Sequence, residues 1–328
     1  PTPLTWTEII LSNLDASIQP AHTFGTPGEQ YFIQEWNSGQ LRLAKVTSPG
    51  GTPTWTDRGS VTVNAFNSTI SLPGIPQLGS GNTIDAGDTR LLNAVYRNGS
   101  LWTTHHVVAA AGDKIEVAWY SIDPLSKTTM MQGRIGDSSR WYAYPSIAVN
   151  QDNDVAVGFS GSSPTQYISA YYTLRGSGDN TGTMQPVSLL KSGVAPYYKT
   201  GVTLGGSDTE NRWGDYSATC VDPADNVSFW TLQEYAETPS GGRSMWGTWW
   251  GRFRTASINA PTGLTATPAS STGIDLSWTD RSSNEDGFKI EQKIGSGGTY
   301  AQIGTVGANV TTYSDIGLTA GTTYFYRV

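Results

Sequence analysis

Short runs in which apolar and polar residues alternate, separated by turns rich in glycine and asparagine, follow one another along most of the chain. A period of two residues predicts β-strands with one buried face. The clearest example lies at residues 92–103, where two such runs flank the turn Arg97-Asn98-Gly99-Ser100. An Asn-Gly pair between alternating runs is the strongest short-range signal for a β-hairpin. No stretch has an apolar helical period long enough to predict a substantial helix, so the sequence predicts an all-β chain.

One hairpin sequence occurs twice. Residues 140–150 align without a gap with residues 212–222, which lie 72 positions later, and both begin with Arg-Trp. Each is followed by a polar turn and a second apolar run, at 155–157 and 227–229. A hairpin that recurs at such a long period indicates a repeat architecture, and four-stranded repeats of this kind form the blades of a β-propeller.

Three of the four hairpins are followed by two further strand signals each, which gives four strands per blade. These additional strands are expected at residues 40–46, 54–63, 114–120, 129–134, 167–172 and 186–190. The fourth blade shows only residues 244–250, and its outer strand is expected from residues 4–10, which resemble residues 53–58. Pairing the first and last segments would remove the exposed edges of the ring. Four blades are counted in this way, and a ring of five or six would need residues upstream of Pro1.

The pattern changes near residues 255–261, where a second module begins. Alternating runs at 274–278 and 287–291, with Trp278 in the second predicted strand and Tyr324 near the end, resemble a fibronectin type III domain. The resemblance implies that Trp278 lies in the sandwich core and that Tyr324 forms the tyrosine corner. We therefore expect a propeller at residues 1–255, a linker at 256–260 and a fibronectin type III domain at 261–328. Its seventh strand is expected beyond Val328.

Composition narrows the possible functions. The 328 residues have a formal net charge of -7 and no basic stripe, so no nucleic-acid partner is predicted. No apolar run approaches 18 residues, so no transmembrane segment is predicted. The single cysteine, Cys220, excludes a disulfide within the chain, and we expect it to be a small buried residue. The chain opens on Pro1-Thr2-Pro3, so we expect either that a leader has been removed or that a longer protein precedes it.

The segment Arg212-Trp213-Gly214-Asp215-Tyr216, with Val221-Asp222-Pro223 and Phe229-Trp230 after it, resembles the sialidase-like (BNR-repeat) propellers of secreted bacterial proteins. The resemblance covers residues 4–254. The Asp-box of that superfamily reads Ser-x-Asp-x-Gly-x-Thr-Trp, and the nearest stretch here, residues 48–55, lacks the aspartate. The resemblance therefore implies the fold more than it implies the activity.

One face of a propeller collects the loops that lead into the inner strands and those that leave the second strands. On this basis the residues expected on one face are Glu35, Trp36, Asp88, Arg90, His105, His106, Arg140, Trp141, Tyr142, Arg212, Trp213, Asp215, Glu234 and Tyr235. Aromatic rings stack on sugar faces, and guanidinium groups bind carboxylates in a bidentate manner. The residues expected to bind such a ligand are Glu35, Trp36, Arg140, Trp141, Tyr142, Arg212, Trp213 and Asp215. The stretch 64–87 has no clear strand pattern, and we expect it to be a loop that reaches the same face.

The sialidase resemblance implies specific roles. Arg90, Arg140 and Arg212 would clamp a carboxylate; Tyr235 or Tyr142, activated by Glu234, would be the nucleophile. Asp215 or Asp88 would be the general acid. A structural explanation stays open: Trp141 and Trp213 would fill space between sheets, while Arg140 and Arg212 would bind loop carbonyls. His105 and His106 are adjacent on a strand and point to opposite faces, so neither a metal site nor a cofactor is predicted.

The sequence therefore favours a secreted or surface-attached bacterial protein that binds a glycan or an extracellular protein without catalysis. Two alternatives stay open. One is a glycoside hydrolase of sialidase type, and the other is a self-assembling subunit of an extracellular layer or filament, since few charges and many Trp and Tyr residues suit packed interfaces.

Overall fold

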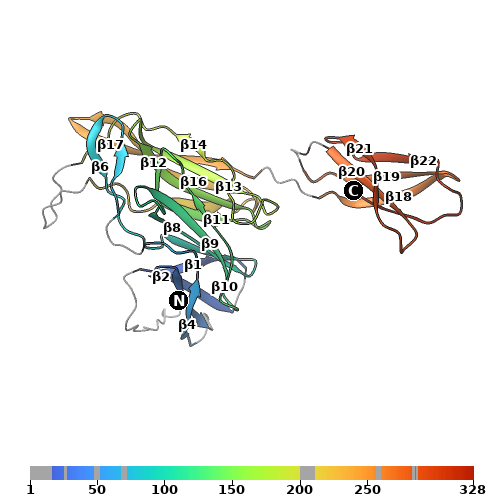
Figure 1. Ribbon diagram of the computed structural model, residues 1–328, viewed down its shortest axis with the longest axis horizontal. Coiled ribbons are helices and arrows are strands. Elements are labelled where there is room, and N and C mark those ends of the chain that lie inside the picture. Colours follow the sequence, from blue (N-terminus) through green and yellow to red (C-terminus); the bar gives the residue numbers. More distant parts are fainter. Residues whose placement is uncertain are drawn as a thin grey trace, which may run out of the picture. The chain divides into compact units, whose positions relative to one another are not determined.

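The computed structural model describes residues 17–25, 28–47, 52–67, 72–199, 211–255, 260–282, 285 and 287–328. All regular structure in these ranges is β, in 23 strands (Figure 1), which confirms the predicted fold class. The chain forms two compact units, Pro1–Thr255 and Ala256–Val328. No helix in the described ranges is long and apolar enough to cross a membrane.

The described strands of the N-terminal unit form an eight-stranded, a four-stranded, a three-stranded and a two-stranded sheet. One parallel strand pair divides the eight-stranded sheet into two antiparallel halves of four strands each, called the first and second sheets below, and the four- and three-stranded sheets are called the third and fourth. The first sheet holds β1 (Ile18–Thr23), β2 (Glu29–Asn37), β3 (Gln40–Thr47) and β4 (Thr54–Thr62). The second holds β7 (Asn93–Arg97), β8 (Ser100–Val108), β9 (Ile115–Asp123) and β10 (Thr128–Ile135). The third holds β11 (Trp141–Val149), β12 (Val155–Ser163), β13 (Gln166–Arg175) and β14 (Ser188–Lys191). The fourth holds β15 (Ala218–Val221), β16 (Phe229–Ser240) and β17 (Arg243–Phe253).

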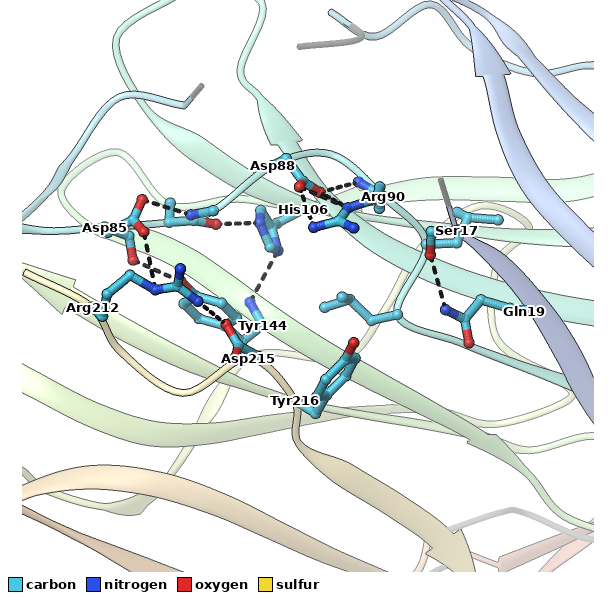
Figure 2. A pocket seen from close by; sticks show the side chains of 14 residues that line it. Ser17, Gln19, Asp85, Asp88, Arg90, His106, Tyr144, Arg212, Asp215 and Tyr216 are labelled. Carbon is cyan, nitrogen blue, oxygen red and sulfur yellow. Dashed lines mark hydrogen bonds and ion pairs between the residues drawn. The ribbon is translucent and has the colours of Figure 1, made fainter. Parts of the chain in front are cut away.

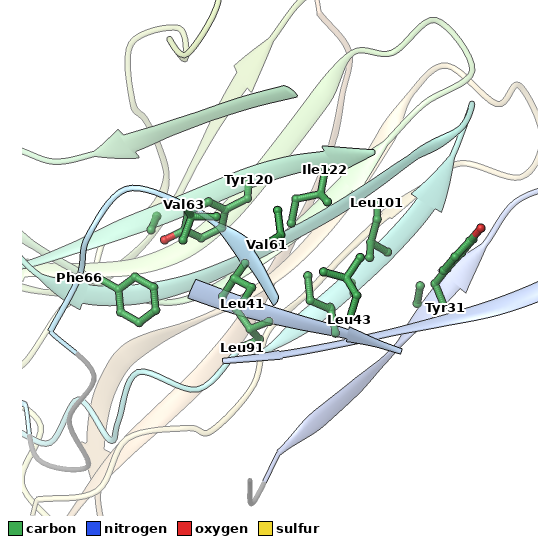
Figure 3. Close-up of a cluster of buried hydrophobic side chains, with 14 of the residues drawn as sticks. Tyr31, Leu41, Leu43, Val61, Val63, Phe66, Leu91, Leu101, Tyr120 and Ile122 are labelled. Carbon is green, nitrogen blue, oxygen red and sulfur yellow. The ribbon is translucent and has the colours of Figure 1, made fainter. Parts of the chain in front are cut away.

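Consecutive sheets pack face to face, as the blades of a propeller do. β1 and β7, the innermost strands of the first two sheets, are hydrogen-bonded in parallel, with Ala21 opposite Ala94. A core of fully buried side chains fills the space between these two sheets (Figure 3), and it includes Leu41 and Leu43 from β3 and Leu101 from β8. Each such side chain contributes about 1.5–3 kcal/mol of burial free energy. The alternation that predicted the strands therefore also builds the contacts between sheets.

The third and fourth sheets meet through a buried polar cluster rather than through apolar contacts alone. The Ser146 hydroxyl lies 2.8 Å from Thr219 Oγ1, which lies 2.9 Å from Thr231 Oγ1. Gly158 allows this approach, because a Cβ there would lie 2.3 Å from the Gln233 and Thr231 side chains. Hydrogen bonds fix the alignment of the two sheets more closely than apolar contacts would.

The two copies of the repeated hairpin are not identical in structure. In the first copy, strand β11 begins at Trp141, whereas in the second copy residues 211–217 precede β15 and are not part of a strand. The Arg-Trp segment thus begins a strand once and forms a loop once. The loop form is the one that lines the cavity described below.

Two predictions are wrong. Residues 64–87 contain a small hairpin, β5 (Ile75–Gln77) and β6 (Ser80–Ile84), which was missed because Pro76 and the neighbouring glycines obscure the alternation. Cys220 is exposed. Its counterpart Ala148 is buried against Val221 and Phe229, but no described residue covers the corresponding face of the fourth sheet, where Trp250 is also 64% exposed.

The C-terminal unit is a sandwich of two three-stranded sheets. One holds β18 (Thr262–Ser270), β19 (Gly273–Thr279) and β22 (Thr312–Ile316). The other holds β20 (Gly287–Ile294), β21 (Ala301–Gly307) and β23 (Tyr324–Arg327). Trp278 is buried against Phe288, and the Tyr324 hydroxyl accepts a hydrogen bond of 3.0 Å from the amide of Thr319. Both residues take the places that the fibronectin type III resemblance implied.

Two expectations fall outside the described residues. The proposed outer strand at residues 4–10 is not among the described ranges, and neither is the first half, residues 48–51, of the stretch compared with the Asp-box.

Candidate functional site

A polar cavity of about 340 Å³ opens in the N-terminal unit where the innermost strands of the sheets converge (Figure 2). It is lined from the β6–β7 loop, from the segment that leads into β15, and from the start of the first sheet. His106 of β8 and Tyr144 of β11 line the rest of the cavity. The lining residues that carry chemistry are Ser17, Gln19, Asp85, Asp88, Arg90, His106, Tyr144, Arg212, Asp215 and Tyr216.

Arg212 joins two carboxylates on one side of the cavity. Its Nη2 lies 2.5 Å from Oδ1 of Asp215, and its Nε lies 3.6 Å from Oδ2 of Asp85. Asp85 also accepts a hydrogen bond of 2.9 Å from the amide of Gly87, which fixes the β6–β7 turn. The guanidinium thereby ties the β6–β7 loop to the segment before β15.

Asp88 and Arg90 form a second charge pair in the same loop. Nε of Arg90 lies 2.8 and 2.7 Å from the two oxygens of Asp88, and the Arg90 amide also donates to Oδ1. Burial alone would raise the pKa of the Asp88 carboxyl, but the hydrogen bonds from Arg90 outweigh it and hold the pKa below its ordinary value. The cavity therefore presents an ionised carboxylate at neutral pH.

Glu234, at the back of the Arg212 loop, has the opposite tendency. Burial raises the pKa of its carboxyl against the opposing hydrogen bond from the Gly214 amide, and the nearby charge of Asp215 raises it further. The contact with Gly214 is so close that a Cβ there would lie 2.1 Å from Oε2 of Glu234. Glycine at position 214 is thus what lets the carboxyl support the loop.

We expect Gly214→Ala to destabilise the N-terminal unit by about 1 kcal/mol, because the added methyl group would displace the Glu234 carboxyl, which accepts a hydrogen bond from the Gly214 amide. Urea unfolding at pH 7 measures the change. Gly178→Ala is the matched control, since a Cβ at Gly178 meets no atom within 4 Å. Equal stability of the two variants would contradict the assignment.

The structure brings together only part of the predicted set. Asp88, Arg90, His106, Arg212 and Asp215 line the cavity, and Glu234 lies behind it. Arg140 lies elsewhere, where it pairs with Asp137 at 2.8 Å and donates to Gln166. Two of the three arginines proposed for a clamp therefore share the cavity.

The remaining predicted residues have partners of their own outside the cavity lining. The Trp141 ring donates a hydrogen bond to the Asp113 carbonyl, and the buried Trp213 ring donates one to the Ser160 hydroxyl. The structural explanation expected Arg140 and Arg212 to bind loop carbonyls, but both form ion pairs with carboxylates. Contacts of the others are as follows: Glu35 accepts from Thr89, Trp36 stacks under Arg42, Tyr142 is buried between sheets, and Tyr235 donates to Glu237. Burial raises the pKa of the Tyr142 phenol to about 12.

Asp85, Tyr144 and Tyr216 were not among the residues predicted for this face, and His106 was predicted there without a ligand role. Tyr216 could have been found, because it directly follows Asp215 in the repeated segment and is 70% exposed. Tyr144 could not, because its role depends on a left-handed backbone (φ 55°) in the middle of a strand.

Residues 259–328 match the family model of the fibronectin type III domain. No curated protein matches the chain. Among solved structures, the chain is similar to the GH43 endo-arabinanase of Bacillus licheniformis, with 10% identity over 80% of this chain and 88% of that chain and a TM-score of 0.30. It is also similar to the endo-arabinase of Bacteroides thetaiotaomicron, with 14% identity over 88% and 89% of the two chains and a TM-score of 0.34.

A third similar structure is the GH93 alpha-L-arabinofuranosidase of Fusarium graminearum in complex with arabinobiose. The identity is 11% over 88% of this chain and 92% of that chain, and the TM-score is 0.39.

Proposed function

We propose that the cavity binds a neutral carbohydrate. The observation that carries this proposal is the alternation of charge along its wall: the carboxylates of Asp85, Asp88 and Asp215 are interleaved with the guanidinium groups of Arg90 and Arg212. Such a wall offers acceptors and donors side by side, as the hydroxyl groups of a sugar require. The exposed ring of Tyr216 at the rim supplies a flat apolar surface for a sugar face.

The same pairing disfavours an acidic sugar. Arg90 and Arg212 are each already bound to carboxylates, so an anionic ligand would have to displace an aspartate and leave it unpaired. A neutral hydroxyl group, in contrast, bridges an existing pair without breaking it. The proposal therefore differs from the sialic acid specificity that a three-arginine clamp would give.

Around this site we infer a secreted or surface-attached multidomain protein. The propeller, residues 1–255, carries the site; residues 256–260 link it to the fibronectin type III domain, residues 261–328, which serves as a spacer. Adhesion to extracellular glycans is the function that this combination supports best.

A second candidate function is glycoside hydrolysis, and Glu234 is the specific observation in its favour. A general acid benefits from a raised pKa, and burial together with the nearby charge of Asp215 raises the pKa of Glu234. In this case Glu234 would donate the proton, and Asp215, which lines the cavity, would be the second carboxyl group.

The test is calorimetric titration with a panel of neutral and sialylated oligosaccharides, followed by fluorogenic glycosides. We expect a neutral sugar to bind, and Arg212→Met to weaken its binding at least tenfold, about 1.4 kcal/mol, because two carboxylates lose their common partner. Arg252→Met is the matched control: Arg252 is half-exposed and pairs with Asp222 and Asp225 outside the cavity.

Three outcomes separate the candidates. Binding without hydrolysis supports adhesion, whereas hydrolysis that disappears in Glu234→Gln while binding persists supports the enzyme. Failure of every sugar to bind, or equal binding by Arg212→Met and the wild type, overturns the proposal.

A further inference from the structure

His106 lies directly beneath the cavity, only 1% exposed, and both of its ring nitrogens are engaged. Nε2 lies 2.6 Å from the carbonyl oxygen of Ala86, and Nδ1 lies 3.1 Å from the amide nitrogen of Tyr144. A carbonyl oxygen only accepts and an amide N–H only donates, so the hydrogen must be on Nε2 and Nδ1 must accept. The ring is therefore neutral and held in one tautomer.

The backbone of Tyr144 is in a strained, left-handed conformation. It is a non-glycine residue with φ of 55°, at the point where the pairing of β11 with β12 shifts between Ala143 and Ser146. A left-handed conformation costs an aromatic residue on the order of 1–3 kcal/mol, so its surroundings must hold it there. The hydrogen bond from its amide to His106, with the two rings 5.3 Å apart, is one of the contacts that do so.

Tyr144 in turn contacts both segments that carry the charge pairs, and Figure 2 shows its contact with Asp85 in the β6–β7 loop. Its hydroxyl donates to the Asp85 carbonyl at 2.7 Å, and its own carbonyl accepts from the Ser217 hydroxyl at 2.8 Å. Burial raises the pKa of the Tyr144 phenol, which keeps it protonated and able to donate. His106 and Tyr144 together connect β8, the β6–β7 loop, β11 and the segment before β15.

We propose that His106 is a positioning residue for ligand binding: by accepting from Tyr144 and donating to Ala86, it sets the spacing between the Asp88–Arg90 pair and the Asp85–Arg212–Asp215 cluster. A sugar that bridges the two sets of charges needs this spacing to be fixed before it binds. The inference rests on the proposed carbohydrate function for its ligand, but the hydrogen-bonded connection itself does not.

The test compares His106→Gln with His106→Met. Glutamine keeps one donor and one acceptor on a side chain of similar reach, whereas methionine fills the space without either. We expect His106→Met to weaken binding of the sugar that the wild type binds by at least tenfold, and His106→Gln to restore binding to within about threefold of the wild type. Asn150→Ala is the stability control, because Asn150 is fully buried in the turn at the far end of β11, where it bonds Asp154 and the Val227 carbonyl and no residue of the cavity.

Nuclear magnetic resonance supplies a readout that needs no ligand. The imidazole nitrogen shifts of His106 should show a protonated Nε2 and an unprotonated Nδ1 at pH 7. The Tyr144 amide should exchange slowly with solvent in the wild type and in His106→Gln but rapidly in His106→Met. The other tautomer, or slow exchange in His106→Met, overturns the inference.

The two proposals fail separately. If the wild type binds no sugar, the carbohydrate function is wrong, and the exchange of the Tyr144 amide still decides whether His106 holds it. If the wild type binds sugar, and His106→Met and Asn150→Ala weaken this binding to the same extent as each other, His106 has no positioning role. The carbohydrate function then stands.

Discussion

Acidification from pH 6.5 to pH 4 is expected to lower the free energy of unfolding of the N-terminal unit by several kcal/mol, through two adjacent buried histidines. His105 and His106 are 0% and 1% exposed. His105 has Nδ1 2.5 Å from the carbonyl of Thr89 and Nε2 3.0 Å from the hydroxyl of Tyr120. A second hydrogen on the His106 ring would lie against the amide N–H of Tyr144, which can only donate, and a second hydrogen on the His105 ring would require the Tyr120 hydroxyl to turn from donor to acceptor.

The direction of the effect follows from the two pKa values. Burial lowers the pKa of His105 to about 3 and that of His106 to about 4, against an ordinary value of about 6.5. Above pH 6.5 neither state binds a proton, so stability does not change. Between pH 6.5 and 4 the unfolded chain binds two protons that the folded chain excludes, which costs about 1.4 kcal/mol per pH unit for each histidine.

Urea unfolding at several pH values between 5 and 7 measures this slope. His105→Gln is expected to remove about half of it, whereas His22→Gln, at an exposed position of β1, is expected to leave it unchanged. All three histidines of the chain lie in the N-terminal unit, so the transition of the fibronectin type III unit serves as an internal reference. A flat pH dependence would show that the two rings are protonated in the folded protein.

Phe159→Ala is expected to destabilise the N-terminal unit by about 3–5 kcal/mol. Phe159 lies in β12, is fully buried, and packs against Tyr142 and Tyr171 with ring centroids 4.9 and 6.3 Å away. Its cluster joins the second and third sheets, so truncation leaves a cavity between two blades that neither sheet can fill alone. The cost therefore includes lost contacts as well as lost burial.

Chemical denaturation at pH 7 tests this value. Leu125→Ala is the control, since Leu125 is 66% exposed in the turn between β9 and β10 and its truncation is expected to change stability by less than about 0.5 kcal/mol. Phe159→Leu should fall between the two variants, because leucine fills part of the space. A loss of less than about 1 kcal/mol in Phe159→Ala would mean that the sheets do not pack through this cluster.

The strands and their grouping into four-stranded sheets could be predicted from the sequence, because alternation and turn residues act over a few neighbouring positions. The Asn98-Gly99 turn is a clear case: both residues have positive φ in the structure, as the Asn-Gly signal requires. The β5–β6 hairpin was missed because it lacks such a local signal: β5 contains Pro76 and has only three residues, too few for a clear alternation.

The candidate site could be predicted only in part. Arg212 and Asp215 are neighbours in the sequence, and a search for charged loops finds them. Arg212 is joined to the β6–β7 loop by Asp85, and Tyr144 contacts both this loop and the segment before β15. Asp85 and Tyr144 lie far from Arg212 in the sequence, and neither belongs to a recognisable motif. The exposure of Cys220 could not be predicted either. Its position in the repeat predicts burial, but the arrangement of the sheets leaves it exposed.

The all-β class, most of the hairpins and the fibronectin type III domain follow from the order of the amino acids, because each of these depends on local periodicity or on side chains at fixed spacings. The packing of the sheets sets which charged residues share a cavity, which carboxyl has a raised pKa and which histidine contacts the two strands and loops around it. These properties depend on distances and burial that arise when sheets far apart in the chain pack face to face.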